Sequence, residues 1–189
     1  MSDFVEFWLR PRIERFRAEH PNMLFCINGE GDAPLRRGVA DCEISFAAPA
    51  TGANTETLFH DYVAPLTSRA NVKRISSRSK RERLEGFPLL HLDFYKDDPA
   101  VPNWAAWSVK HRVRRTAPER GIRFQRIAPV IEAVCADAGV TICGLALLRD
   151  PFEANELALP FPIATGAWTA HAFQARFRAD AASRPQVRQ

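Results

Sequence analysis

Residues 127–148, with the sequence IAPVIEAVCADAGVTICGLALL, constrain the fold of this chain more than any other passage. Their first part has apolar residues at helical spacing, with Val130, Ile131, Val134 and Cys135 directed inward. Gly139 suits the end of a helix, because glycine readily adopts the left-handed backbone conformation found there. The apolar run after Gly139 predicts a strand. The passage therefore predicts a helix that ends at Gly139 and turns directly into a strand.

Strand and helix patterns alternate along the rest of the chain, which favours an α/β fold. Strands are expected over residues 23–29, 40–46, 57–68, 89–94, 122–127, 156–162 and 167–177. Helices are expected over residues 4–20, 32–39 and 103–115, and another should begin within 183–189 with Ser183 as its N-cap. Pro11 should kink the first helix or mark a late first turn, because proline lacks the backbone donor. The stretch 69–87 is expected to be helical or irregular.

Charge is distributed unevenly along the chain. The 189 residues hold 26 Lys and Arg against 22 Asp and Glu, but residues 69–126 alone carry 15 Lys and Arg against 6 Asp and Glu. Such a segment can bind nucleic acid or an anionic ligand, although a solvated basic surface is the commoner explanation. Trp104, Trp107 and Val109 share one side of the helix predicted over 103–115. We expect them to pack in a core, with stacking on a ligand as the alternative.

The first 20 residues carry charges from Asp3 to Glu19 that a secretory signal does not tolerate, and the chain has no apolar run long enough to span a membrane. A cytoplasmic protein is therefore expected. The four cysteines, Cys26, Cys42, Cys135 and Cys143, lie in apolar segments without C-x-x-C spacing. They are expected to be reduced and buried.

An enzyme is disfavoured because the chemically capable residues lack supporting spacing. His60 and Asp61 adjoin on a predicted strand and should point to opposite faces, while His91 and Asp93 offer only two potential metal ligands on one face. The sequence contains no G-x-S-x-G, H-E-x-x-H or phosphate-binding glycine loop. We therefore assign no catalytic residue, metal ligand or cofactor.

Six segments, taken in order, resemble the effector-binding domain of LysR-type transcriptional regulators. They are FWLRPRIERFRAEHPNMLFCI (7–27), LRRGVADCEISFA (35–47), LFHDYVAPLTS (58–68), GFPLLHLDF with NWAAW (86–94 and 103–107), AVCADAGVTICGLALL (133–148) and ELALPFP (156–162). Together they span nearly the whole chain. The chain departs from the family pattern where it has Val140 and Thr141 in place of a second glycine.

The resemblance implies a two-lobed, type II periplasmic-binding-protein-like fold, in which two Rossmann-like subdomains are joined by two crossovers. Subdomain I would comprise residues 1–67 and 155–189, and subdomain II residues 68–154. The crossovers would fall at Ser68 and near Asn155. A small effector would bind in the cleft between the lobes, at the carboxyl ends of the strands.

The family's contact segments match eight positions of this sequence. These are Ser45 and Ala47 on one strand, Thr67 and Ser68 at the first crossover, Gln125, Arg126 and Ile127 before a helix, and Thr141 on the strand after that helix. The start of the helix opened by Ala128 and Pro129 suits a carboxylate effector, and Arg126 could add charge. The alternative is that Arg126 points into solvent, and that Ser45, Thr67 and Thr141 cap nearby backbone.

Family members begin with a winged helix-turn-helix, a linker helix and a first core strand, none of which matches a segment here, and Met1 falls beside the first regulatory helix. We therefore expect a fragment of a regulator, or a gene product with a misplaced start. By resemblance, the full-length protein would form a homodimer or tetramer and bind DNA only through that missing domain, with no membrane partner. A stand-alone solute-binding protein of the same fold is the alternative, and it would need an export signal.

Overall fold

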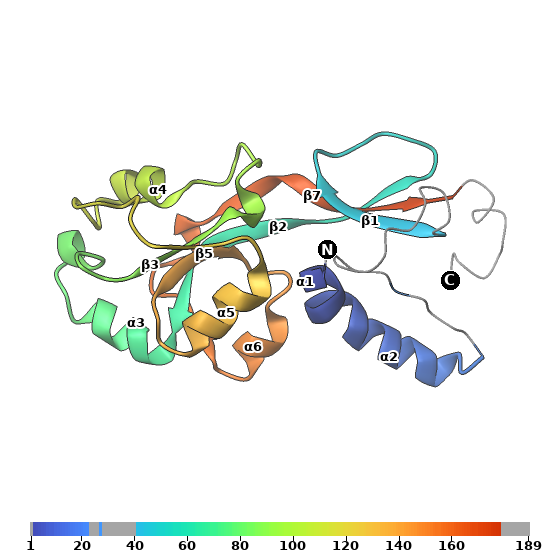
Figure 1. Cartoon of the computed structure of the whole chain (residues 1–189), viewed down its shortest axis with the longest axis horizontal. Coiled ribbons are helices and arrows are strands. Elements are labelled where there is room, and N and C mark those ends of the chain that lie inside the picture. Colours follow the sequence, from blue (N-terminus) through green and yellow to red (C-terminus); the bar gives the residue numbers. More distant parts are fainter. Residues whose placement is uncertain (1, 23–26, 28–40, 179–189) are drawn as a thin grey trace. The chain divides into compact units, whose positions relative to one another are not determined.

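The computed structural model describes residues 2–22, 27 and 41–178, which form two compact units (Figure 1). Unit 1 comprises Met1–His60 and His171–Gln189, and unit 2 comprises Asp61–Ala170. Strands β2 (Thr55–Ser68) and β7 (Ala167–Phe177) are continuous and pass from one unit to the other. The subdomain boundaries expected from the sequence, at Ser68 and near Asn155, differ from these unit boundaries and stay a prediction.

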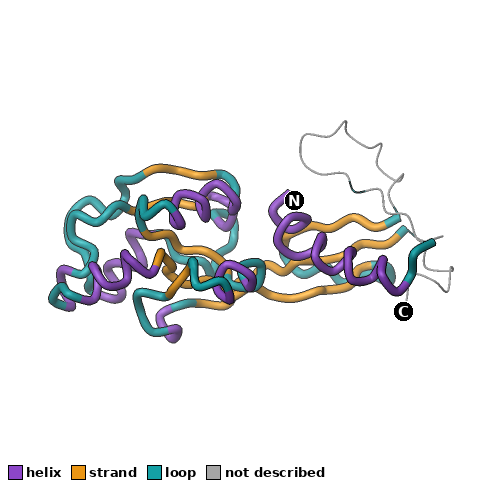
Figure 2. The backbone as a smooth tube through the Cα atoms, turned by 90° about the horizontal axis from the view of Figure 1, so that it is seen from below, coloured by secondary structure: helices purple, strands orange, loops and turns teal. Residues whose placement is uncertain are grey.

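Unit 1 contains a helical segment and three strands in the order β1-β7-β2. Its other elements are α1 (Ser2–Phe4), the π-helical segment η1 (Val5–Leu9), α2 (Arg10–Glu19) and β1 (Cys42–Ala47). Strand β1 pairs antiparallel with β7, so that Cys42 lies opposite Phe177 and Ala47 opposite Ala172. Figure 2 shows α1, η1 and α2 as one helical rod alongside these strands.

The predicted helix over 4–20 is confirmed, and Pro11 marks a change in its geometry. Pro11 lies at the start of α2, directly after the π-helical segment. A proline has no N–H to donate to the preceding turn, so the regular α-helical ladder begins again only at this point. The rod packs through stacked rings, since the Phe4 ring lies 5.2 Å from Phe173 and the Trp8 ring 5.6 Å from Phe59.

Unit 2 contains four strands in the order β2-β5-β3-β4, and β6 pairs with the end of β2. Its elements after β2 are α3 (Arg69–Ser76), η2 (Lys80–Glu82), β3 (Leu89–Leu92), η3 (Asp93–Tyr95), α4 (Trp104–His111), β4 (Ile122–Phe124), α5 (Ile127–Cys135), β5 (Val140–Gly144), α6 (Arg149–Glu153), β6 (Leu157–Ala158) and η4 (Ile163–Thr165). Strand β3 runs parallel to β4 and β5, whereas β2 is antiparallel to β5 and β6.

Helices cover both sides of the unit 2 strands, with α3, α5 and α6 on one side and α4 on the other in Figure 1. Val130 and Val134 of α5 are fully buried, as are Leu66 of β2 and Val140 of β5. The helix and strand predicted over 127–148 are therefore confirmed as α5 and β5. The two tryptophans of α4, Trp104 and Trp107, are also buried, as core packing predicts.

Several local predictions were wrong. The residue with a left-handed backbone after α5 is Asp137, with φ of 61°, and not Gly139. Gly139 is needed instead for a close approach, because a Cβ atom there would lie 2.6 Å from the Pro88 carbonyl oxygen. Cys135 is exposed, because α5 ends at that residue and its side chain no longer faces the sheet. Val109 is 73% exposed and does not share the buried side of α4.

Three of the predicted strands are shorter than expected, and one of them, β4, ends at Phe124 instead of Ile127. Strand β3 ends at Leu92, and Asp93 and Phe94 belong to the following 3-10 turn, so His91 and Asp93 do not share a strand face. Strand β6 retains only two residues of 156–162, a segment that contains two prolines. The elements predicted over 23–29, 32–39 and 183–189 lie wholly or largely outside the described residues, as do Cys26 and Ser183.

The cysteine prediction holds in part. The described cysteines Cys42, Cys135 and Cys143 are free thiols, but only Cys143 is buried. Cys42 begins β1 and is exposed at the end of that strand. A cysteine in an apolar segment is therefore not always buried when it lies at the end of a helix or strand.

Candidate functional site

The residues before α5 form a polar cluster where β3 and β4 end. The guanidinium of Arg123 lies 3.0 Å from Asp93 Oδ1, and the Gln125 side-chain amide donates to Asp93 Oδ2 at 3.0 Å. Asp93 follows β3 directly and Gln125 follows β4. Because the two strands are parallel, their carboxyl ends meet at one edge of the sheet, which is where open α/β sheets bind ligands.

Arg126 and Ile127 open helix α5 in different environments. Arg126 is exposed, with an extended backbone at the N-cap position and no side-chain capping bond. Ile127 is fully buried in the core. The apolar Ile127 side chain thus anchors the start of α5, while Arg126 places a cation beside the positive end of the helix.

Thr141 lies on β5 between Leu66 of β2 and Leu90 of β3 in the strand register. It is fully buried, and its Oγ1 has no hydrogen-bond partner in the structure. An unpaired buried hydroxyl costs about 1–3 kcal/mol of stability. Local backbone capping, the alternative expected for Thr141, is therefore not the role of this hydroxyl in the structure.

Thr67 and Ser68 at the end of β2 make structural hydrogen bonds. The Thr67 hydroxyl donates to the Gly139 carbonyl at 2.7 Å and is fully buried. The Ser68 hydroxyl accepts from Asn71 N at 3.2 Å, which caps α3, and bonds the Asp137 carboxylate. Both residues therefore tie the start of α3 to the turn between α5 and β5.

Ser45 and Ala47 lie on β1 in unit 1 and are half-buried. Ser45 lies opposite Gln174 of β7. The buried Gln174 side chain donates to the carbonyls of Ala47 at 3.1 Å and Ala48 at 3.0 Å, and it accepts from Ala50 N at 2.8 Å. The end of β1 is thus held in place by one amide side chain.

Sequence reasoning missed the hydrogen bonding of a buried carboxylate of unit 2, that of Asp61. The side chain is fully buried and accepts from Tyr62 N at 2.8 Å, Ala146 N at 3.0 Å and the Tyr95 hydroxyl at 2.9 Å. Burial raises the pKa of Asp61, and these three donors partly oppose the rise. The opposite faces predicted for His60 and Asp61 are confirmed, because His60 is exposed.

No group of three or more His, Cys, Asp or Glu able to hold a metal ion occurs among the described residues. Within the same residues, no helix is long and apolar enough to cross a membrane.

The comparisons with known proteins show the class of fold and a similarity in sequence to one regulator. The effector binding domain of AmpR from Citrobacter freundii has a TM-score of 0.71 at 19% identity, covering 100% of this chain and 90% of that one. The regulatory domain of CrgA, a LysR-type transcriptional regulator from Neisseria meningitidis, has a TM-score of 0.63 at 17% identity, covering 98% and 89%. These likenesses show that the chain has the type II periplasmic-binding-protein-like fold.

Sequence similarity supports the same relationship. The chain is 28% identical over 158 residues to the HTH-type transcriptional regulator TrpI of Pseudomonas aeruginosa, covering 82% of this chain. The chain spans about half the length of this relative, 52%. No protein-family model matches the chain. The relatives that the chain resembles are thus a transcriptional regulator and the effector-binding or regulatory domains of such regulators, rather than enzymes.

Proposed function

We propose that the chain senses a small anionic metabolite, which binds in the cleft between subdomains I and II and thereby controls transcription. The observation that carries this proposal is the similarity to a transcriptional regulator over 82% of the chain. Regulators need a signal as well as a DNA-binding part, and a type II periplasmic-binding-protein-like fold is suited to hold a small ligand.

The anionic character of the effector is supported by the residues that open α5. Arg126 contributes an exposed cation, and Gln125 contributes an amide donor whose present partner is Asp93. A helix N-terminus favours negative charge, so an anion beside α5 would gain from both. The remaining proposed contacts are Ser45, Ala47, Thr67, Ser68, Ile127 and Thr141.

The proposed regulator would be a cytoplasmic homodimer or tetramer that contacts DNA through an N-terminal winged helix-turn-helix. The matched half of the relative leaves room for such a domain. An effector would act by shifting the population between two assemblies, which requires a different affinity for each of them. The chain itself would then hold the sensing role without contacting DNA.

A thermal-shift screen against small carboxylic acids and amino acids tests the sensing role. A ligand at 100 times its Kd should raise the melting temperature by about 5–10 °C, because it stabilises a chain of this size by about 2.7 kcal/mol. If no compound shifts the melting temperature, the proposal loses its support.

Thr141→Val and Gln125→Ala then test the proposed site against a matched control. Thr141→Val removes an unpaired buried hydroxyl, so the ligand-free protein should keep or slightly gain stability while the ligand-induced shift falls. Ser108→Ala is the control, because the Ser108 hydroxyl is also buried without a partner but lies on α4. Equal ligand-induced shifts in all three variants would exclude Thr141 and Gln125 from the site.

A stand-alone solute-binding protein of the same fold is the second candidate function, favoured only by the shared architecture. The genomic sequence upstream of the Met1 codon distinguishes the two. A winged helix-turn-helix and a linker helix encoded in frame there support the regulator. An export signal in their place would support the solute-binding protein.

A further inference from the structure

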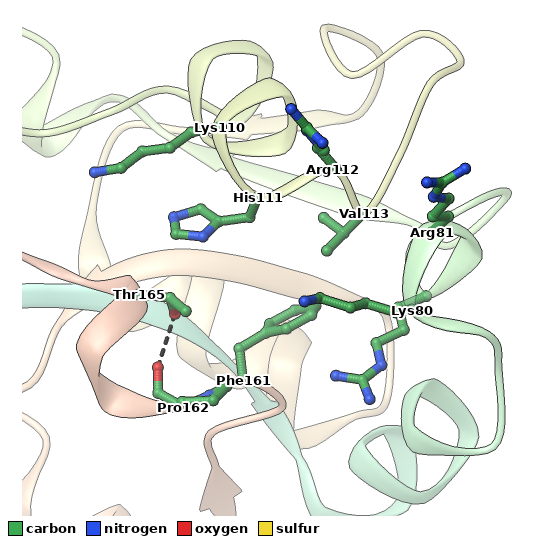
Figure 3. A pocket seen from close by; sticks show the side chains of 10 residues that line it. Lys80, Arg81, Lys110, His111, Arg112, Val113, Phe161, Pro162 and Thr165 are labelled. Carbon is green, nitrogen blue, oxygen red and sulfur yellow. Dashed lines mark hydrogen bonds between the residues drawn. The ribbon is translucent and has the colours of Figure 1, made fainter.

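A basic cavity of about 700 Å³ lies within unit 2, formed by the segment after α3, the end of α4 and the turn before β7. Six of its ten lining residues are basic and none is acidic. The basic residues are Lys80, Arg81, Arg83, Lys110, His111 and Arg112. Figure 3 shows the His111 ring directed into the space above Thr165 and Phe161, with the Lys80 side chain extending toward the same space.

Two nitrogen atoms of these basic side chains are buried and have no hydrogen-bond partner in the structure. They are Nε of Arg83 and Nε2 of His111. Buried polar groups in proteins are nearly always hydrogen-bonded, and an exception calls for a missing ligand, ion or water. Both atoms belong to residues that line the same cavity, but they are themselves enclosed by protein atoms, so a bound group would contact the other donors of these two side chains.

The wall of the cavity is held rigidly by Trp107 of α4. Its indole N–H donates to the Thr165 carbonyl at 2.9 Å, its ring lies 4.5 Å from the His111 ring, and it meets the Phe161 ring at 5.0 Å. The Thr165 hydroxyl in turn donates to the Pro162 carbonyl at 2.8 Å. A cavity built on such fixed contacts loses little conformational freedom when a ligand binds.

The end of helix α4 accounts for only some of the positive charge that lines the cavity. Lys110 and His111 lie in the last turn of α4, where cations are favoured by the helix dipole. Lys80, Arg81 and Arg83 come from a segment about 30 residues earlier. No carboxylate from the described part of the chain forms an ion pair with any of them. Two acids lie nearby. Glu82 accepts from the Ser79 hydroxyl at 2.8 Å, and Glu85 accepts from Arg115 N and from the Thr116 hydroxyl.

We propose that this cavity binds a small phosphate-bearing anion, such as a phosphorylated metabolite. Several cationic donors converging without a countercharge match the many acceptor oxygens and multiple charges of a phosphate group. The volume falls in the range of small-molecule sites. Lys80, Arg81, Lys110 and Arg112 are exposed, so a competing DNA duplex is needed to distinguish a small anion from nucleic acid. The site lies entirely within residues 61–170 and does not depend on the effector proposed above.

His111 adds a pH dependence to this binding. Burial, and then the charge of Lys110, lower the pKa of His111 in the empty cavity. The other charged residues that line the cavity with His111 are Lys80, Arg81, Arg83 and Arg112. A bound anion favours the protonated imidazole. Binding therefore takes up a proton, so the contribution of His111 to the affinity should grow as the pH falls.

Isothermal titration of the 189-residue chain with sodium pyrophosphate at low salt tests the site. The double variant Lys80→Gln/Lys110→Gln should bind at least about tenfold more weakly, since each lost charged hydrogen bond is worth about that factor. The double variant Lys73→Gln/Lys96→Gln removes the same two charges from exposed positions outside the cavity and should bind within about twofold of the original chain. Thermal melting of each variant confirms that it is folded.

Three results would overturn the proposal: no binding of pyrophosphate, an equal loss in both double variants, or tighter binding of citrate than of pyrophosphate. Competition with a 20-base-pair DNA duplex is a further test. Displacement of pyrophosphate by the duplex through Lys80 and Lys110 would assign the surface to nucleic acid instead. The ratio of the affinities of the original chain and the His111→Asn variant should grow from pH 7.5 to 5.5, a comparison in which the protonation of pyrophosphate itself cancels. A constant ratio would remove His111 from the site.

Discussion

The Tyr95 hydroxyl donates a 2.9 Å hydrogen bond to Oδ2 of Asp61, and both side chains are buried. The two residues are 34 positions apart, on η3 and β2. Their bond fixes a carboxylate inside a core that is otherwise largely apolar. The local stability of unit 2 should therefore depend on this pair in ways that can be measured.

Tyr95→Phe should destabilise the protein by about 1.5–3 kcal/mol, because it leaves a buried carboxylate with one donor fewer. Tyr62→Phe is the matched control, since Tyr62 is the only other tyrosine and its hydroxyl donates to the Ile163 carbonyl at an exposed site. Tyr62→Phe should lower the free energy of unfolding by less than about 1 kcal/mol. Urea unfolding of the two variants gives both values, and equal losses would contradict the importance of the Tyr95–Asp61 bond.

The free energy of unfolding should depend on pH through Asp61. Burial raises the pKa of Asp61 in the folded state above its ordinary value of about 3.9, so the folded state binds this proton more tightly than the unfolded chain. The resulting stabilisation is fully present below about pH 4 and is lost as the pH rises through the folded pKa.

Asp61→Asn removes this titration. The stability of the original chain relative to the Asp61→Asn variant should fall between pH 3.5 and 8 in urea unfolding experiments. Asp97→Asn, at an exposed position, measures the baseline effect of removing one carboxylate. A relative stability that rises with pH would reverse the sign and contradict the burial argument.

Replacement of Arg114 by lysine should destabilise the protein much more than the same replacement of Arg115. Its guanidinium donates to four carbonyls, those of Thr116 at 2.7 Å, Leu84 at 3.0 Å, Phe87 at 2.6 Å and Ala117 at 3.4 Å. A lysine ammonium cannot reproduce this planar fork, so Arg114→Lys should cost about 2–3 kcal/mol. Arg115→Lys, whose side chain is exposed, should change the melting midpoint little, and equal effects would refute the assignment.

Gly144→Ala should be severely destabilising, by about 3 kcal/mol or more. A Cβ atom at Gly144 would lie 1.9 Å from Asp61 Oδ2 and 2.4 Å from the Tyr95 hydroxyl, so the buried pair would have to move. Gly52→Ala is the control, because a Cβ there meets only Thr55 Oγ1 at 3.6 Å. A normal expression level and melting temperature for Gly144→Ala would show that the pair is not packed as described.

The order of elements was predictable because each element has a local pattern. The passage over 127–148 predicted α5 and β5, and alternation predicted β1, β2 and β7. Errors occurred at the ends of elements, where the local pattern no longer determines the environment. Val109 is exposed because it lies two positions after the buried Trp107, on the opposite side of α4, and Cys135 is exposed as the last residue of α5. Asp137 adopts the left-handed conformation that Gly139 was expected to have.

For the candidate site, the sequence predicted which element each residue belongs to, but not the contacts of its side chain. Strand and helix patterns placed Gln125 before α5 and Thr141 on β5, but not the bond from Gln125 to Asp93, 32 residues away, or the unpaired Thr141 hydroxyl. Asp61 was missed because its partners are 34 and 85 residues distant. Contacts of that kind follow from the fold and leave no pattern in the local sequence.

The pairing of β1 with β7 determines the order in which the parts of the chain can fold during synthesis. Cys42 cannot meet Phe177 until the residues between them have been translated. All strand pairs within residues 61–170 become available earlier, so unit 2 can fold while β1 is still without its partner strand. β1 therefore stays unpaired while unit 2 is synthesised, and this long-range pairing is the step most open to aggregation.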